Sequence, residues 1–136
     1  MRILLKSVLV QDSQSEFNNQ RVDMLADAGR WVQIAPSVNE EADIYINQKG
    51  LSWTPSVVDL RVHHTLPGGE FREDWQTLSA AAKKGGVLDI MLLPTGNPVP
   101  QQPEAIQLIH SKSSEFGIHF HSMAPLSIDN QGENFS

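Results

Sequence analysis

The sequence predicts an α/β fold with a small N-terminal β-rich unit, a βαβαβ segment with parallel strands, and a polar tail, at residues 1–54, 55–126 and 127–136. Two observations support this prediction. Residues 1–50 contain short apolar runs divided by polar turns, a pattern typical of β-strands. From residue 55 onward, apolar runs alternate with helix-forming segments. Strands connected through helices of this length pair in parallel through right-handed crossovers.

Four strands are expected in the β-rich unit, at residues 3–10, 21–26, 30–35 and 42–47. Residues 11–20 form a polar loop between the first two strands. The second and third strands flank the sequence Asp27, Ala28, Gly29, Arg30. This sequence favours a hairpin turn, because glycine accepts the positive φ that such turns require.

The βαβαβ segment begins with a predicted strand at residues 56–63. A helix is predicted over residues 73–84, since Trp75, Leu78 and Ala82 form one stripe and two glycines follow. Residues 87–93 are an almost continuous apolar run, typical of a strand covered on both faces. A rigid proline-containing loop then precedes a helix at 103–116 and a strand at 118–123. Residues 129–136 are expected to fray.

Composition excludes several classes of function. Cysteine is absent, which removes thiolate zinc sites and thiol nucleophiles and is compatible with a reducing compartment, so a cytoplasmic location is expected. The 16 acidic and 10 basic residues give a net charge of −6 without a basic stripe, which disfavours nucleic-acid binding. No apolar run approaches the roughly 20 residues that span a bilayer, so no membrane association is expected.

Several short segments keep the order and spacing of one known family. They are residues 23–30, 50–59, 67–68, 73–74, 80–86 and 94–98. These segments resemble the N-terminal third of the dihydroorotases, members of the amidohydrolase superfamily that open with a small β domain and continue into a metal-binding barrel. The resemblance implies a partial TIM-type barrel, because a complete one needs roughly 250 residues.

The resemblance also implies a His-x-His pair at the end of the first barrel strand, where residues two apart point to the same side and reach one zinc ion. Here the pair reads Arg61, Val62, His63. A guanidinium stays protonated and cannot bind a cation. His63 is therefore expected to be a vestigial metal ligand at most, and an ordinary polar residue at a strand end is the favoured alternative. His64 is expected to point to the other face.

Two substrate contacts implied by the resemblance are also changed. Thr65 stands where the family has an arginine that binds the substrate carboxylate, and Thr95 stands where it has an assisting asparagine. The family's remaining metal ligands and its general acid/base come from later strands. We therefore expect no catalytic residue, no cofactor-binding residue and no cofactor in this chain.

A second His-x-His pair, His119 and His121, lies on the third predicted parallel strand. Same-side imidazoles can bind zinc. The family has no ligands there, and no carboxylate or third histidine stands at a fixed spacing, so partly buried strand histidines are the favoured interpretation. Asp59 and Arg61 share one side of a strand and are expected to pair as a salt bridge.

These features favour a catalytically inactive dihydroorotase-like protein with a structural or assembly role, a pseudoenzyme of pyrimidine biosynthesis. The resemblance supplies a precedent, because some bacterial dihydroorotase homologues without the metal histidines partner aspartate carbamoyltransferase. Three parallel strands leave sheet edges and apolar faces uncovered, so a protein partner or self-association is expected, with aspartate carbamoyltransferase a candidate. The alternative is a zinc-dependent cyclic amide hydrolase completed by another chain. A fragment or gene remnant also stays open.

Overall fold

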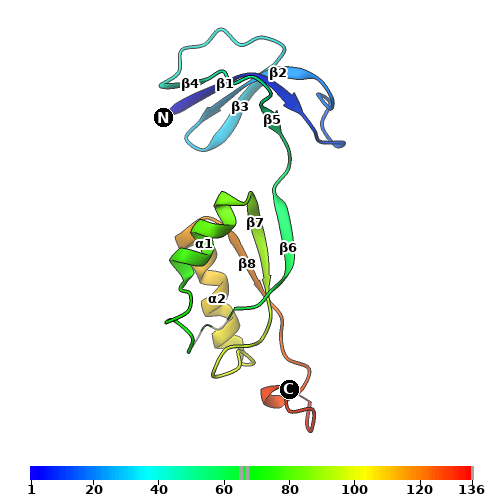
Figure 1. Cartoon of the computed structure of the whole chain (residues 1–136), viewed down its shortest axis with the longest axis vertical. Helices are drawn as coiled ribbons and strands as arrows, with labels where there is room; N and C mark the ends of the chain where they lie inside the picture. The colour runs from blue at the N-terminus through cyan, green and yellow to red at the C-terminus, as the bar shows by residue number, and fades with distance from the viewer. Residues whose placement is uncertain (65, 67, 136) are drawn as a thin grey trace. The chain divides into compact units, whose positions relative to one another are not determined.

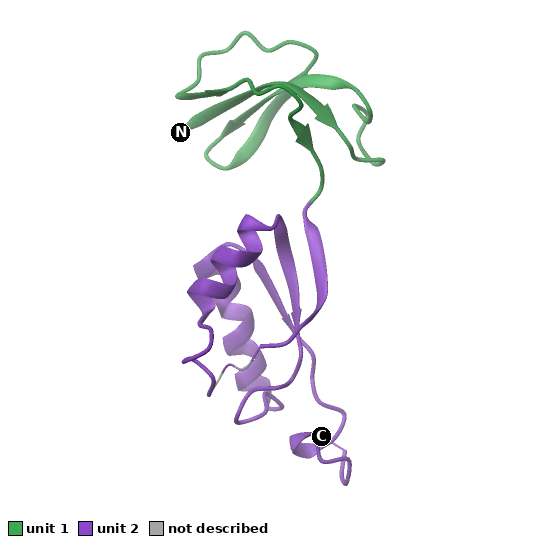
Figure 2. Ribbon diagram, in the orientation of Figure 1, with its two compact units in different colours: residues 1–55 green, residues 56–136 purple. Residues whose placement is uncertain are grey.

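The computed structural model describes residues 1–64, 66 and 68–135. The chain divides into two compact units, Met1–Pro55 and Ser56–Ser136, which are coloured green and purple in Figure 2. Unit 1 contains only strands, and unit 2 contains parallel strands alternating with helices (Figure 1). The predicted α/β fold with a β-rich first part is therefore confirmed.

Unit 1 is a five-stranded sheet in the order β3-β2-β1-β4, with β5 also paired to β1. Strand β1 runs antiparallel to β2 and parallel to β4 and β5. The strands are β1 (Arg2–Val10), β2 (Arg21–Asp27), β3 (Arg30–Ala35), β4 (Ile44–Ile46) and β5 (Ser52–Trp53). The predicted strand at 42–47 is thus shorter, and the two-residue β5 was not predicted.

The turn between β2 and β3 has the expected hairpin geometry. Ala28 and Gly29 both have positive φ, 47° and 79°, as the tight two-residue hairpin turn requires. A register shift in β1 between Leu5 and Val8 marks a β-bulge. Because the bulge reverses the alternation of side chains, Leu4 and Val8 lie in different apolar clusters despite their even spacing.

Unit 2 is a three-stranded parallel sheet in the order β6-β7-β8. Figure 1 shows helices α1 and α2 side by side against one face of this sheet. The elements are β6 (Val57–Val62), α1 (Trp75–Lys84), β7 (Val87–Leu92), α2 (Pro103–Phe116), β8 (His119–Ser122) and the 3-10 helix η1 (Ile128–Asn130). None of the helices described here is long and apolar enough to cross a membrane.

Local sequence signals set the helix ends in unit 2. The Asp74 carboxylate accepts a hydrogen bond from the Thr77 N–H at 2.7 Å, and the Asp74 N–H donates to Thr77 Oγ1 at 3.0 Å. This capping box starts α1 later than the predicted residue 73. Helix α2 has the predicted bounds, with Pro103 in its first turn and Gly117 in the left-handed conformation after its last.

The apolar core of unit 2 lies between the two helices and the sheet. Its buried members come from both helices and from β7, β8 and the residue before β8: Leu78, Ile90, Leu92, Ile109, Ile118 and Phe120. Trp75 packs against this core, and Trp53 packs against a core cluster of unit 1. Trp31 is 42% exposed.

Strand β7 is covered on one face only by the described chain, because both helices lie on that face and Leu88 is 39% exposed. This agrees with the expectation that three parallel strands leave apolar faces uncovered. Two residues at the start of the segment expected to fray make specific hydrogen bonds. The Asp129 N–H donates to Gln101 Oε1 at 2.9 Å, and the Asn130 amide donates to the Pro94 carbonyl at 2.8 Å.

Candidate functional site

The candidate site lies at the carboxyl end of β6, where ligands bind in parallel α/β folds. Arg61 is in β6 and His63 follows its last residue, and both side chains are exposed. His64 is buried, so the neighbouring histidines point in different directions, as alternation in an extended chain requires. The structure thus presents one guanidinium and one imidazole at the two positions of the implied His-x-His pair.

These residues do not fit a zinc ion. Zinc needs several neutral imidazole or anionic ligands, and Arg61 contributes a permanent positive charge instead. Within the described residues, no group of three or more histidine, aspartate and glutamate side chains is arranged to hold a metal ion. The donor chemistry at the end of β6 is therefore not that of a metal centre.

The expected salt bridge between Asp59 and Arg61 is not formed. Asp59 Oδ1 instead accepts a hydrogen bond from the Arg61 backbone N–H at 3.0 Å. Both residues are exposed, and an ion pair in water gains too little to fix two side chains in one geometry. The Arg61 guanidinium is consequently available to solvent.

The burial of the His64 side chain is energetically unfavourable. Its side chain is 3% exposed, and neither ring nitrogen has a hydrogen-bond partner in the described part of the chain. The ring lies 4.8 Å from the Trp75 ring, centroid to centroid. Burial lowers the pKa of His64, the charge of Glu70 opposes this by raising it, and the neighbouring His63 lowers it further. His64 therefore stays neutral and does not serve as an exposed ligand.

Thr95 connects the loop after β7 to the end of β6. Its hydroxyl donates to the His64 carbonyl at 2.7 Å, and its N–H donates to the Leu93 carbonyl at 2.9 Å. These contacts give Thr95 a structural role at the position where the resemblance implies a substrate contact. Thr65, the other changed substrate position, lies outside the described residues.

The loops after β6 and β7 approach each other closely at Gly68. This glycine has a φ of 98°, and a Cβ added to it would lie 2.3 Å from the Asn97 carbonyl oxygen. No side chain fits in that space, so only glycine permits this contact.

The second histidine pair belongs to a cluster that the sequence did not reveal. Asp89 Oδ1 lies 3.0 Å from His119 Nδ1 and 3.2 Å from His121 Nε2. The side chains of His119 and His121 are 71% and 48% exposed, so the prediction of partly buried histidines was wrong. Hydrogen bonds from His121 and His119 lower the pKa of Asp89. The sequence signal for this cluster was Asp89, a single carboxylate within the apolar run at residues 87–93.

Comparison with curated proteins shows similarity to dihydroorotases, although no protein-family model matches the chain. The dihydroorotase of Pediococcus pentosaceus is 38% identical over 104 residues, which are 76% of this chain and 24% of that protein. The dihydroorotase of Streptococcus pyogenes is 32% identical over 122 residues, which are 90% of this chain and 29% of that protein. The chain thus spans about a quarter to a third of these relatives.

Solved structures show a shared fold. An L-hydantoinase (dihydropyrimidinase) from Arthrobacter aurescens matches with a TM-score of 0.69 at 20% identity, over 92% of this chain and 28% of that one. A dihydroorotase structure matches with a TM-score of 0.64 at 14% identity, over 94% and 32%. These matches show that the chain shares its fold with about a third of each of these two structures. The chain is therefore similar to dihydroorotases in sequence and shares its fold with parts of a hydantoinase and a dihydroorotase.

Proposed function

We propose that this dihydroorotase-like chain is catalytically inactive and has a structural or assembly role. The observation that carries the proposal is the guanidinium of Arg61 two residues before His63, at the exposed end of β6. A fixed positive charge at a ligand position repels a dication and supplies no lone pair. Thr95 supports the same conclusion, because its hydroxyl forms hydrogen bonds with backbone carbonyls of this chain.

The exposed surface of β6 supports an assembly role. This strand lies at one edge of its sheet, and Val57, Val58 and Leu60 are 56%, 53% and 65% exposed. Consecutive residues of a strand point to opposite faces, so apolar side chains are exposed on both faces of this edge. An exposed apolar edge strand favours pairing with another chain. The resemblance provides the proposed partner, aspartate carbamoyltransferase, and with it a place in pyrimidine biosynthesis.

Size-exclusion chromatography with light scattering tests this role. We expect a stoichiometric complex when the chain is mixed with aspartate carbamoyltransferase. Leu60→Glu should weaken the complex, because it places a charge on the proposed contact strand. Leu108→Glu is the matched control, since Leu108 is 59% exposed on α2. A monodisperse monomer that forms no complex, or equal weakening by both variants, would argue against the proposal.

The alternative is a zinc-dependent cyclic amide hydrolase whose site is completed by another chain. The retained His63 and the similarity to dihydroorotases favour it. Elemental analysis after purification in zinc-containing buffer separates the two functions. The alternative predicts stoichiometric zinc that His63→Ala removes and His119→Ala retains. Absence of zinc from the wild-type protein would leave the inactive role as the better explanation.

A further inference from the structure

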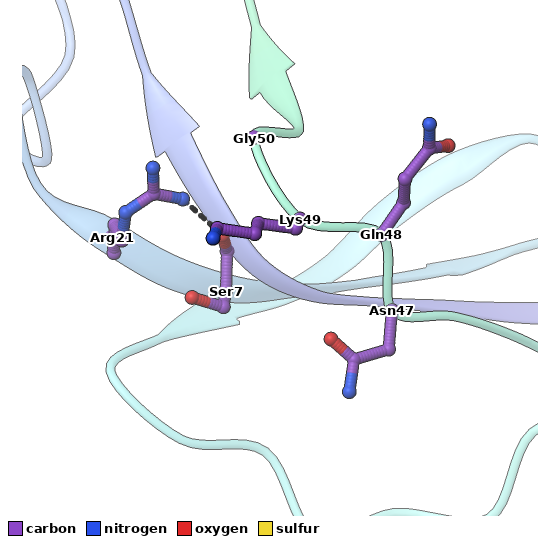
Figure 3. Close-up of a pocket in the computed structure, with 6 residues that line it drawn as sticks. All are labelled: Ser7, Arg21, Asn47, Gln48, Lys49 and Gly50. Atoms are coloured by element: carbon purple, nitrogen blue, oxygen red, sulfur yellow. Dashed lines mark hydrogen bonds between the residues drawn. The ribbon is translucent and has the colours of Figure 1, made fainter.

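A polar hollow of about 460 Å³ lies within unit 1. It is formed by β1, β2 and the segment between β4 and β5, through Ser7, Arg21, Asn47, Gln48, Lys49 and Gly50. Figure 3 shows that the Lys49 side chain extends toward Arg21 and Ser7. The hollow therefore brings two cationic groups and a hydroxyl from distant parts of the sequence together.

The bulge in β1 fixes the position of Arg21. Ser7 has a φ of 54°, and its carbonyl oxygen accepts a hydrogen bond from Arg21 Nη1 at 2.7 Å. This bond uses one of the five guanidinium N–H groups and leaves the others for a ligand. The Ser7 N–H donates a hydrogen bond to Asp23 Oδ1 at 2.9 Å. The Arg21 guanidinium is thus held by a backbone hydrogen bond before any ligand binds.

The charges in this hollow are unbalanced. None of its lining residues is acidic, although the chain has 16 acidic and 10 basic residues. Neither Arg21 nor Lys49 forms an ion pair within the described residues, whereas Lys6 is paired with Asp23. Asp23 is 5% exposed and does not line the hollow. Two positively charged side chains that line the same hollow attract an anion.

We propose that this hollow binds the oxyanion group of a small metabolite, a phosphate or a carboxylate. Arginine recognises such groups through paired N–H donors, and lysine adds a mobile point charge. The Asn47 and Gln48 amides supply donors and acceptors for the rest of the ligand. The volume falls within the range of about 300–1,000 Å³ that is typical of small-molecule sites. This inference is independent of the proposed inactive role.

Titration of the isotope-labelled full chain, followed by backbone amide NMR, tests the site. The probes are inorganic phosphate, a simple phosphomonoester and succinate, which separate phosphate from carboxylate recognition. We expect at least one probe to give saturable shifts at the Ser7 and Gly50 amides, with a dissociation constant of about 1 mM or below. Chloride at equal ionic strength should not reproduce these shifts.

Two charge-matched variants complete the experiment. Lys49→Gln should weaken binding about tenfold, because it removes one charge-assisted contact. It should leave the fold intact, since the Lys49 side chain is exposed. Lys84→Gln makes the same charge change at the end of α1 in unit 2 and should leave binding unchanged. Absence of saturable shifts with every probe, or equal weakening by both variants, would overturn the inference.

Discussion

Replacement of His64 by leucine is expected to stabilise unit 2. The imidazole is 3% exposed and both ring nitrogens lack partners among the described residues. A buried polar group without a partner costs about 1–3 kcal/mol. Leucine removes that cost but loses the ring contact with Trp75, which is worth about 0.5–1.5 kcal/mol. The net expected gain is about 1 kcal/mol in the free energy of unfolding, which corresponds to a rise of about 4–8 °C in Tm.

The gain should increase as the pH falls. Burial is the main cause that lowers the pKa of His64 below its ordinary value of 6.5. Just below that pH the unfolded chain binds a proton that the folded chain does not, so the wild-type protein loses stability on acidification. The leucine variant carries no such group at this position. The stability difference is therefore smallest above the unfolded pKa and larger below it.

Urea denaturation at about pH 8 and about pH 5 measures both effects, because the unperturbed imidazole titrates between these values. His110→Leu is the control, since His110 is exposed on α2. The control should change stability by less than about 0.5 kcal/mol at either pH. A destabilised His64→Leu variant, or one with the same pH dependence as the wild-type protein, would contradict this prediction.

Three further outcomes are expected. Burial alone would raise the pKa of Asp23, but hydrogen bonds from Lys6 and two backbone N–H groups lower it. Asp23→Asn should therefore lower the free energy of unfolding by about 3 kcal/mol at neutral pH, which is above the carboxyl pKa. A denaturant titration measures this loss. An unchanged midpoint would contradict this. Gly68→Ala should cost about 1–3 kcal/mol by the same assay, because its Cβ would collide with the Asn97 carbonyl; a neutral effect would show that the loops separate freely. Replacing both β8 histidines by alanine should return the pKa of Asp89 toward 3.8 in a carboxyl NMR titration, and an unaltered titration would exclude them as its cause.

Local signals in the sequence predicted the elements whose ends depend on nearby residues. Helix α2 matched the prediction because a proline in its first turn and Gly117 after its end act within one turn of the chain. The β2–β3 hairpin matched for the same reason, since Ala28 and Gly29 alone set its turn.

Features that depend on distant partners were not predictable in the same way. The two-residue strand β5 exists only because Ser52 and Trp53 pair with β1, more than forty residues earlier. The contact between Asp89 and the β8 histidines depends on a parallel register that places Asp89 opposite His119. No spacing within one strand encodes that register.

The candidate site was predictable in position but only partly in chemistry. The sequence placed Arg61 and His63 on one side of β6 and His64 on the other, because alternation in a strand is a local property. It did not reveal that the imidazole of His64 has no partner, or that the Thr95 hydroxyl binds a backbone carbonyl. Both facts depend on how the loops after β6 and β7 meet. The hollow in unit 1 was likewise hidden, because a bulge and three separate segments form it.

Catalytic inactivity is tested most directly by an assay of dihydroorotate hydrolysis with the purified chain in zinc-containing buffer, alone and with aspartate carbamoyltransferase. We expect no turnover above the protein-free reaction in either mixture. Arg61→His should also remain inactive, because a single restored ligand does not rebuild the substrate contact at Thr95. Zinc-dependent turnover by the wild-type chain that disappears in His63→Ala would contradict catalytic inactivity.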